Sequence, residues 1–161
     1  MFRILRALTF CSVIVVSGCS GSSSPATVNP EDPTITAAID SVLAVLQDGA
    51  THVNADRVLE PASATGELTL VVGNVMMSGK DKIREAFTAT YAGLEKQDQT
   101  VIEKKIRVLT PDVAIADILS EGTYTDKAGW TSEPVDITTT LVFVKENGQW
   151  KVRHGHQSIT R

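Results

Sequence analysis

Two histidines near the end of the chain are the residues best suited to proton chemistry. His154 and His156 stand two positions apart among β-forming residues, a spacing that places both side chains on one face of a strand. Histidine changes charge near neutral pH, so either imidazole could serve as a general base. Asp117 or Tyr124, from strands predicted below, could orient that base. The alternative is structural: His154 bonds a backbone carbonyl and His156 fills the core.

Other side chains with chemical potential are suited to binding rather than to metal chemistry. Structural and catalytic zinc sites use at least three protein ligands, and no third ligand accompanies the histidine pair, since His52 lies in a distant loop. We therefore predict no metal and no cofactor. Four aromatic residues and one methionine are the candidates for lining a pocket, with ordinary packing as the alternative for each: Trp150, Tyr124, Phe87, Tyr91 and Met76.

Three helices are predicted in the first half of residues 34–161. The first begins with Thr34 as its N-cap and ends at Asp48-Gly49. Its buried face would carry apolar residues at helical spacing: Ile35, Ile39, Val42 and Leu46. The second is short and covers Ala55–Glu60. The third covers Lys80–Leu94 with Ser78 as its cap, and its buried side would carry Ile83, Phe87 and Tyr91.

Long strands joined by short turns follow the helices. A short apolar run, Leu68–Val72, ends at the turn signal Gly73-Asn74. Four longer strands are predicted later in the chain: Thr100–Leu109, Val113–Tyr124, Val135–Val144 and Gln149–Ile159. Helices followed by an antiparallel meander of four strands predict an α+β fold in which the helices cover one face of a curved sheet.

The last turn, Asn147-Gly148, is a strong signal for a two-residue hairpin. Counting back from this turn in steps of two places both histidines on the face of Trp150. In this register Val152 would lie opposite Phe143, His154 opposite Leu141 and His156 opposite Thr139. A bulge in the last strand would shift this assignment by one residue.

The residues of this hairpin also carry a family resemblance. The segment from Gly148 to Ser158 resembles the terminal strand of SnoaL-like domains, G-x-W-x-[IV]-x-H-x-H-x-S, and residues 75–87 are similar to the segment that leads into their third helix. The resemblance spans residues 34–158. It implies the nuclear transport factor 2-like fold, a cone-shaped curved antiparallel sheet wrapped around three N-terminal helices with a pocket at its wide end. That superfamily contains isomerases, hydrolases, cyclases, oligomerisation modules and carriers, so the fold alone assigns no function.

Two departures weigh against the steroid-isomerase chemistry of that superfamily. Those enzymes resemble this chain around Ser78-Gly79 but carry a carboxylate base on the strand before it, where residues 68–72 contain no acid. Their second acid corresponds to Thr140, which cannot act as a protonated carboxylic donor. No set of residues matches the Asp-Arg-Asp relay of the related epoxide hydrolases either.

The N-terminal residues indicate where the protein is located. Residues 1–18 combine a basic start with an apolar stretch too short to span a bilayer. They end in Val-Ser-Gly before Cys19, which resembles a bacterial lipobox and implies cleavage before Cys19 and lipidation of its thiol and amine. Ser20 resembles the sorting signal for the outer membrane. We expect a protein lipid-anchored in a bacterial cell envelope, facing the periplasm from the outer membrane of a diderm, or otherwise on the outer face of the cytoplasmic membrane.

Composition divides the remainder into a tether and one domain. Residues 19–33 are rich in Ser, Gly and Pro and predict a flexible tether, and residues 34–161 suffice for one core. The only other cysteine is Cys11, inside the signal peptide, so the domain can form no disulfide. Loss of the signal peptide lowers the formal net charge from −4 to −6. An acidic chain without a basic stripe argues against nucleic acid as a partner.

Two functions from different classes remain open. In the first, the cone binds a small apolar or amphipathic molecule or serves as a dimerisation or interaction module. In the second, the domain is an enzyme that uses His154, His156 and Asp117 for proton transfer on a small organic substrate. Related cones commonly pair through the outer face of the sheet, which here would present a β-branched stripe: Thr138, Thr140, Val142 and Val144. We therefore expect a homodimer.

Overall fold

Residues 28–64 and 68–160 are described by a computed structural model of the chain. The predicted signal peptide, Cys19 and most of the tether lie outside these residues. The described helices are α1 (Pro33–Thr51), α2 (Ala55–Val58) and α3 (Lys80–Tyr91). The strands are β1 (Thr69–Val72), β2 (Val75–Ser78), β3 (Leu94–Thr110), β4 (Val113–Asp126), β5 (Val135–Glu146) and β6 (Gln149–Thr160).

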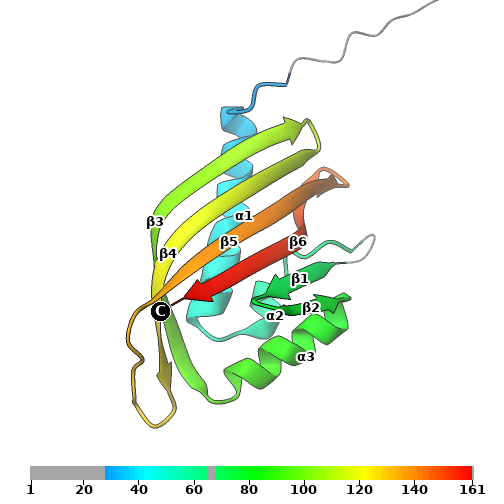
Figure 1. The fold of residues 1–161 in the computed structure, drawn as a ribbon. Coiled ribbons are helices and arrows are strands. Elements are labelled where there is room, and N and C mark those ends of the chain that lie inside the picture. The colour runs from blue at the N-terminus through cyan, green and yellow to red at the C-terminus, as the bar shows by residue number, and fades with distance from the viewer. Residues whose placement is uncertain (1–27, 65–67, 161) are drawn as a thin grey trace, which may run out of the picture.

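A single curved sheet organises the domain, and its strand order is β2-β1-β6-β5-β4-β3 (Figure 1). Strands β3 to β6 form the predicted antiparallel meander, which confirms the α+β class. The short strands β1 and β2 extend it: β1 pairs with β6 in parallel and β2 pairs antiparallel with β1. The sheet therefore has six strands instead of four. The parallel pair joins segments about 85 residues apart, and no local turn signals it.

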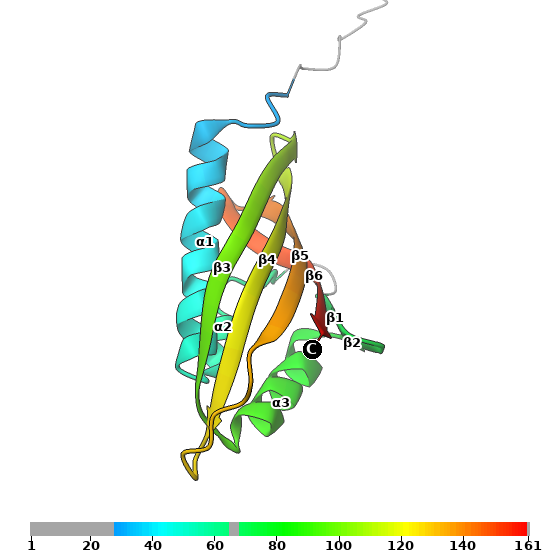
Figure 2. The ribbon, with the colours of Figure 1, turned by 60° about the vertical axis from the view of Figure 1, so that its left-hand side comes forward.

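The sheet bends around the helices and encloses one hydrophobic core on its concave face (Figure 2). Helix α1 lies along β3 and is joined to it by three contacts. The backbone carbonyl of Gln99 accepts a hydrogen bond from the Gln47 side chain, and the Lys104 ammonium pairs with Asp40. The Pro30 carbonyl, just before α1, accepts a hydrogen bond from the Val108 amide at 2.9 Å.

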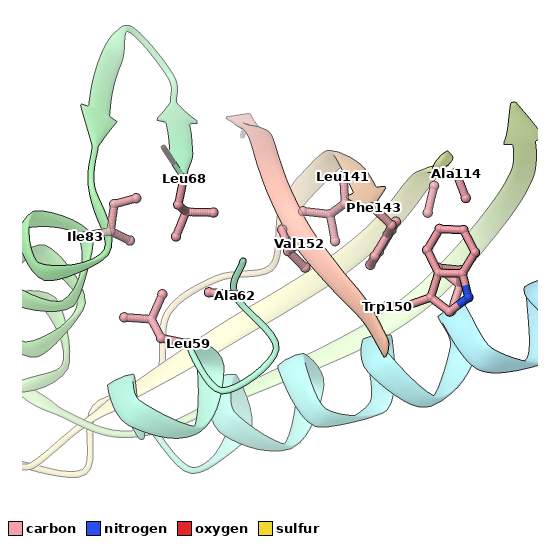
Figure 3. Close-up of a cluster of buried hydrophobic side chains, with 11 residues drawn as sticks. Leu59, Ala62, Leu68, Ile83, Ala114, Leu141, Phe143, Trp150 and Val152 are labelled. Atoms are coloured by element: carbon pink, nitrogen blue, oxygen red, sulfur yellow. The ribbon is translucent and has the colours of Figure 1, made fainter. Parts of the chain in front are cut away.

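The core is deepest where α1 crosses β4, β5 and β6 (Figure 3). Phe143 and Ile39 are fully buried, as are Ala114 and Ala116 on β4. Helix α3 contributes Ile83, which is 1% exposed. The apolar face predicted for the first helix is confirmed, because Ile39 is buried and its neighbours along that face pack against the core: Ile35, Val42 and Leu46.

Several helix ends differ from their prediction. Asp32, and not Thr34, caps α1: its carboxylate accepts hydrogen bonds from the amides of Thr34 and Ile35 at 2.9 and 3.1 Å. Pro33 then occupies the first turn, where its missing N–H costs nothing. Helix α1 continues through Gly49 to Thr51. Helix α3 is capped by Gly79 without any side-chain bond, so Ser78 is not its cap.

The end of α3 is the largest shift of a boundary. The helix ends at Tyr91 and β3 begins at Leu94, so that residues 94–99, predicted partly as helix and partly as loop, extend the strand. Their sequence is polar and shows no strand alternation. Pairing with β4 compensates for this weak local preference, since Leu94 pairs with Asp126 and Gln97 with Tyr124.

None of the helices among the described residues is both long and apolar enough to cross a membrane.

Substitution of Gly49 by alanine tests how closely α1 packs against α2. A Cβ added at Gly49 would lie 2.5 Å from the backbone nitrogen of Val58, so α2 would have to move. We expect Gly49→Ala to lower the urea midpoint, because overpacking costs about 1–3 kcal/mol and outweighs the helix propensity of about 1 kcal/mol that alanine adds. Gly93→Ala is the control: its Cβ meets nothing within 4 Å. Equal midpoints for Gly49→Ala and the unchanged protein would contradict this packing.

Candidate functional site

The predicted direction of the two histidines was wrong because β6 contains a bulge. The hairpin register begins as predicted, with Phe143 opposite Val152. The next pair is Val142 with His154, so the ladder gains one residue on β6 at Arg153. Every later residue of β6 is thereby turned to the other face. His154 and His156 leave the face of Trp150 and point away from the core.

The bulge residue Arg153 is held by a partly buried ion pair. Its guanidinium donates to Glu146 Oε1 at 2.9 Å and to Ser63 Oγ at 3.0 Å. The Ser63 hydroxyl in turn donates to the same carboxylate, and the amide of Ala64 donates to Glu146 Oε2 at 3.1 Å. The Glu146 side chain is 11% exposed and that of Arg153 is 33% exposed. These contacts tie the β5–β6 hairpin to the segment before β1.

Gly155 occupies the concave position that the sequence assigned to a histidine. A Cβ at Gly155 would lie 3.0 Å from Leu70 Cδ1 and 3.1 Å from Leu141 Cδ2. An imidazole there would collide with both side chains. The bulge therefore places the one residue of this stretch without a side chain against the core.

We call the opposite side of the sheet the outer face. Strand alternation places on it residues from four strands: Thr69 and Val71 of β1; His154, His156 and Ser158 of β6; Thr138, Thr140, Val142 and Val144 of β5; and Ile115, Asp117 and Leu119 of β4. The β-branched stripe predicted on β5 thus lies on this face. Each of the four residues of this β5 stripe is partly or fully exposed.

The three candidates for catalysis share the outer face but do not form a relay. Asp117 is bound to its neighbours on β3 and β5: Arg107 Nη2 lies 2.5 Å from its Oδ2, and Thr140 donates to its Oδ1 at 2.9 Å. Thr140 separates Asp117 from His156, because it pairs with both residues across the sheet. Within the described residues neither imidazole makes a hydrogen bond. Asp117 therefore does not orient a histidine in this structure.

The concave face carries no carboxylate or imidazole at the inward positions of β5 and β6, or at those of β4 from Ala114 to Tyr124. Four neutral members lie toward the α3 end, where Ser120 is fully buried and the others are partly buried, and two hydrogen bonds link them. Gln99 donates to Ser120 at 2.5 Å, and Gln157 donates to Thr139 at 3.3 Å. This surface can accept and donate hydrogen bonds, but it offers no group that titrates near neutral pH.

The five binding candidates are distributed over the domain. Phe87 and Tyr91 contact each other on α3 with ring centroids 5.6 Å apart, and burial raises the pKa of Tyr91 to about 12. Tyr124 instead packs edge-on against Trp130 of the β4–β5 loop at 5.8 Å. Trp150 belongs to the core near α1, and Met76 is 68% exposed on the edge strand β2.

Trp150 also lines a groove of about 450 Å³ between α1 and the β5–β6 hairpin. Its wall combines apolar side chains of α1 with residues after α2 and at the hairpin: Ala38, Ser41, Val42, Val45, Glu60, Pro61, Gly148, Gln149, Trp150 and Lys151. The other four binding candidates do not contribute to it. In the part of the chain that the structure describes, no three His, Cys, Asp or Glu residues gather around a possible ion.

Substitution of Glu146 tests the ion pair at the bulge. Glu146→Gln keeps the shape of the side chain and removes the charge that faces Arg153. We expect it to lower the free energy of unfolding by about 1–3 kcal/mol, because a partly buried charge loses its partner. Glu60→Gln is the matched control, since Glu60 pairs with Arg57 at 2.5 Å but is 59% exposed. An exposed pair contributes less than about 1 kcal/mol. Equal losses in urea unfolding of the two variants would contradict the special place of Glu146.

Comparison with known proteins identifies the superfamily. Residues 33–160 match the family model for the calcium/calmodulin dependent protein kinase II association domain. No curated protein sequence matches the chain at a significant level. A nuclear transport factor 2-like superfamily protein from Salmonella enterica aligns with a TM-score of 0.71 at 17% identity, covering 80% of this chain and 93% of that one.

Two further solved structures share the fold. A Xanthomonas campestris protein, named as a candidate calcium/calmodulin dependent protein kinase II association domain, is 24% identical with a TM-score of 0.60, covering 84% of this chain and 94% of that chain. A ketosteroid isomerase-like protein from Erwinia carotovora atroseptica is 20% identical with a TM-score of 0.63, covering 76% and 94%. The resemblance to the nuclear transport factor 2-like superfamily is confirmed, and within it the chain belongs to the calcium/calmodulin dependent protein kinase II association domain family.

Proposed function

We propose that the chain is a membrane-tethered, non-catalytic association module whose domains pair through the outer face of the sheet. The observation that carries this proposal is the composition of that face. Its centre on β4 and β5 consists of five uncharged residues around Asp117, and all six are exposed or partly exposed: Ile115, Leu119, Thr138, Thr140 and Val142. Short, stiff side chains on a pleated surface lose little conformational freedom when they are covered.

Charged groups border this centre on one side. Arg107, Lys105 and Glu103 lie there on β3 by register, and Asp117 within the centre is held by Arg107 and by the Thr140 hydroxyl. A largely uncharged centre with a polar rim on one side is compatible with a specific protein interface. Because one face serves both copies, a two-fold axis generates a closed dimer from this single patch.

The concave face supports an enzymatic function less well. Proton transfer needs a group of suitable pKa with access to the substrate. The ionisable candidates, His154, His156 and Asp117, lie on the outer face, while the inward positions of β4 to β6 carry neutral side chains apart from Lys145 and Asp126 near the strand ends. The family name adds support for association, since it describes a domain by which a kinase assembles.

The tether would connect this module to a membrane. The domain begins with α1 at Pro33, directly after residues 19–33. The Pro30 carbonyl already bonds to β3, so the free part of the tether would end near this residue. A lipidated Cys19 would then hold the domains close together in the plane of a membrane, which raises their effective concentration and favours pairing.

A charge in the centre of the outer face should separate the dimer. We expect the chain without signal peptide and Cys19 (residues 20–161), which retains every core residue described above, to sediment as a dimer at tens of micromolar. Val142→Glu should sediment as a monomer, because an unpaired carboxylate would be buried in the contact.

Val75→Glu is the control for this experiment. Val75 is 55% exposed, but it lies on the edge strand β2 and, by strand alternation, on the opposite side of the sheet from Val142. It should remain a dimer. Monomeric behaviour of the unsubstituted chain, or a Val142→Glu chain that still dimerises while its circular dichroism is unchanged, would overturn the proposed interface.

Lipidation can be tested separately with the two cysteines. Cys19→Ala should yield an unprocessed or soluble precursor, because no thiol remains for the thioether. Cys11→Ala, inside the predicted signal peptide, should still be processed and anchored. The measurement is membrane fractionation after a high-salt wash, together with the mass of the mature N-terminus. A Cys19→Ala protein that carries lipid and resists the wash would refute the lipoprotein assignment.

A further inference from the structure

We infer that association through the outer face is controlled by pH, because the face that pairs contains His154 and His156. This inference rests on the proposed function and adds a regulatory property to the same surface. The bulge at Arg153 sets the geometry, since it turns both imidazoles outward. His154 then lies directly beside Val142 and His156 directly beside Thr140. A contact centred on the β5 stripe must therefore touch or cover both imidazoles.

The neighbours of the histidines offer no charge to stabilise an imidazolium. On the β5 side the adjacent residues are Val142 and Thr140, and on the β1 side they are Thr69 and Val71. Beyond β1, strand β2 contributes Ser78 and Met76 to the same rows. None of these six side chains ionises, and Ser158, the next outer residue of β6, is also neutral.

Within the rows of the two histidines, charged groups begin two strands away. Asp117 follows Thr140 in the row of His156, and its carboxylate is already bound by Arg107 and by the Thr140 hydroxyl. Lys105 and Arg107 continue the two rows on β3. The nearest acid within the same copy is therefore occupied, and the next groups are basic. A protonated histidine gains no attraction from its own sheet.

The sign of the pH effect follows from this environment. In the separated domains His156 is exposed and His154 partly exposed, so water can solvate their charged forms. Covering them with a second copy removes that water and favours the neutral imidazole. Binding of protons then competes with pairing, so association should be tighter at pH 7.5 than at pH 5.5. Each dimer contains four such groups, so their effects accumulate.

Sedimentation equilibrium of residues 20–161 at pH 7.5 and pH 5.5 tests the inference, with EDTA present so that no metal ion bridges the histidines. We expect the dimer dissociation constant to rise at least about tenfold at the lower pH, with circular dichroism showing a folded protein at both. In a chain with both His154→Gln and His156→Gln, the ratio of the two constants should fall close to one, whatever the affinity at pH 7.5. His154→Gln alone and His156→Gln alone should each lower the ratio of the two dissociation constants only partway toward one.

The third histidine of the chain provides a matched control. His52 follows α1 beside Asp48, away from the outer face, and its side chain is 72% exposed. His52→Gln should keep the full pH ratio. A ratio near one in the unsubstituted dimer, or tighter association at pH 5.5, would overturn the pH control while leaving the dimer intact. Absence of a dimer at pH 7.5 would instead overturn the proposed interface itself, and the inference with it.

Discussion

The ion pair between Arg153 and Glu146 is the interaction on which the two faces of the sheet depend. It holds the extra residue of β6 at the hairpin and links it to Ser63. Beyond that point the order of inward and outward residues is reversed. Gly155 comes to lie against Leu141, and the two histidines come to lie outside. A single inserted residue thus decides which chemistry each surface of the domain can offer.

The division between the faces is consistent with a domain built for contact rather than for reaction. Near α1 the concave face is filled by packed apolar residues such as Phe143 and Ala116. Toward α3 it carries neutral amides and hydroxyls, linked by bonds such as that from Gln157 to Thr139. The two histidines and Asp117 lie outside, where a second surface could cover them. The fold is shared with relatives named for isomerases, but the distribution of ionisable groups here differs from what such a reaction would need.

The sequence predicts the parts of this fold that depend on local patterns. Helical spacing identified the buried face around Ile39, and the Asn147-Gly148 turn identified the last hairpin and its first pair, Phe143 with Val152. The bulge could not be predicted in the same way, because the contacts that hold it include one from Arg153 to Ser63, 90 residues earlier in the chain. The direction of the histidines, and with it the interpretation of the site, depended on that distant contact. A glycine between two histidines was the one local hint, since a Cβ at the inward position would be in tight contact with Leu70 and Leu141.

Two other features that the sequence did not predict also depend on contacts between distant or neighbouring strands. The parallel pairing of β1 with β6 joins distant segments and leaves no periodic signal. The polar start of β3 becomes a strand only because β4 lies beside it. By contrast, the cap at Asp32 was available from the sequence, because an acid directly before Pro33 is a stronger start signal than the threonine after it.

The position of α1 along β3 bears on how the protein avoids aggregation. Strand β3 has 17 residues and forms one edge of the sheet, and a long open edge can recruit strands from other molecules into fibrils. The Pro30 carbonyl occupies the amide of Val108, the Gln47 side chain occupies the carbonyl of Gln99, and Lys104 is held by Asp40. Loss of α1 from this edge, for example by cleavage before the helix has docked, would expose a template for misassembly. The first helix thus protects the solubility of the sheet as well as completing its core.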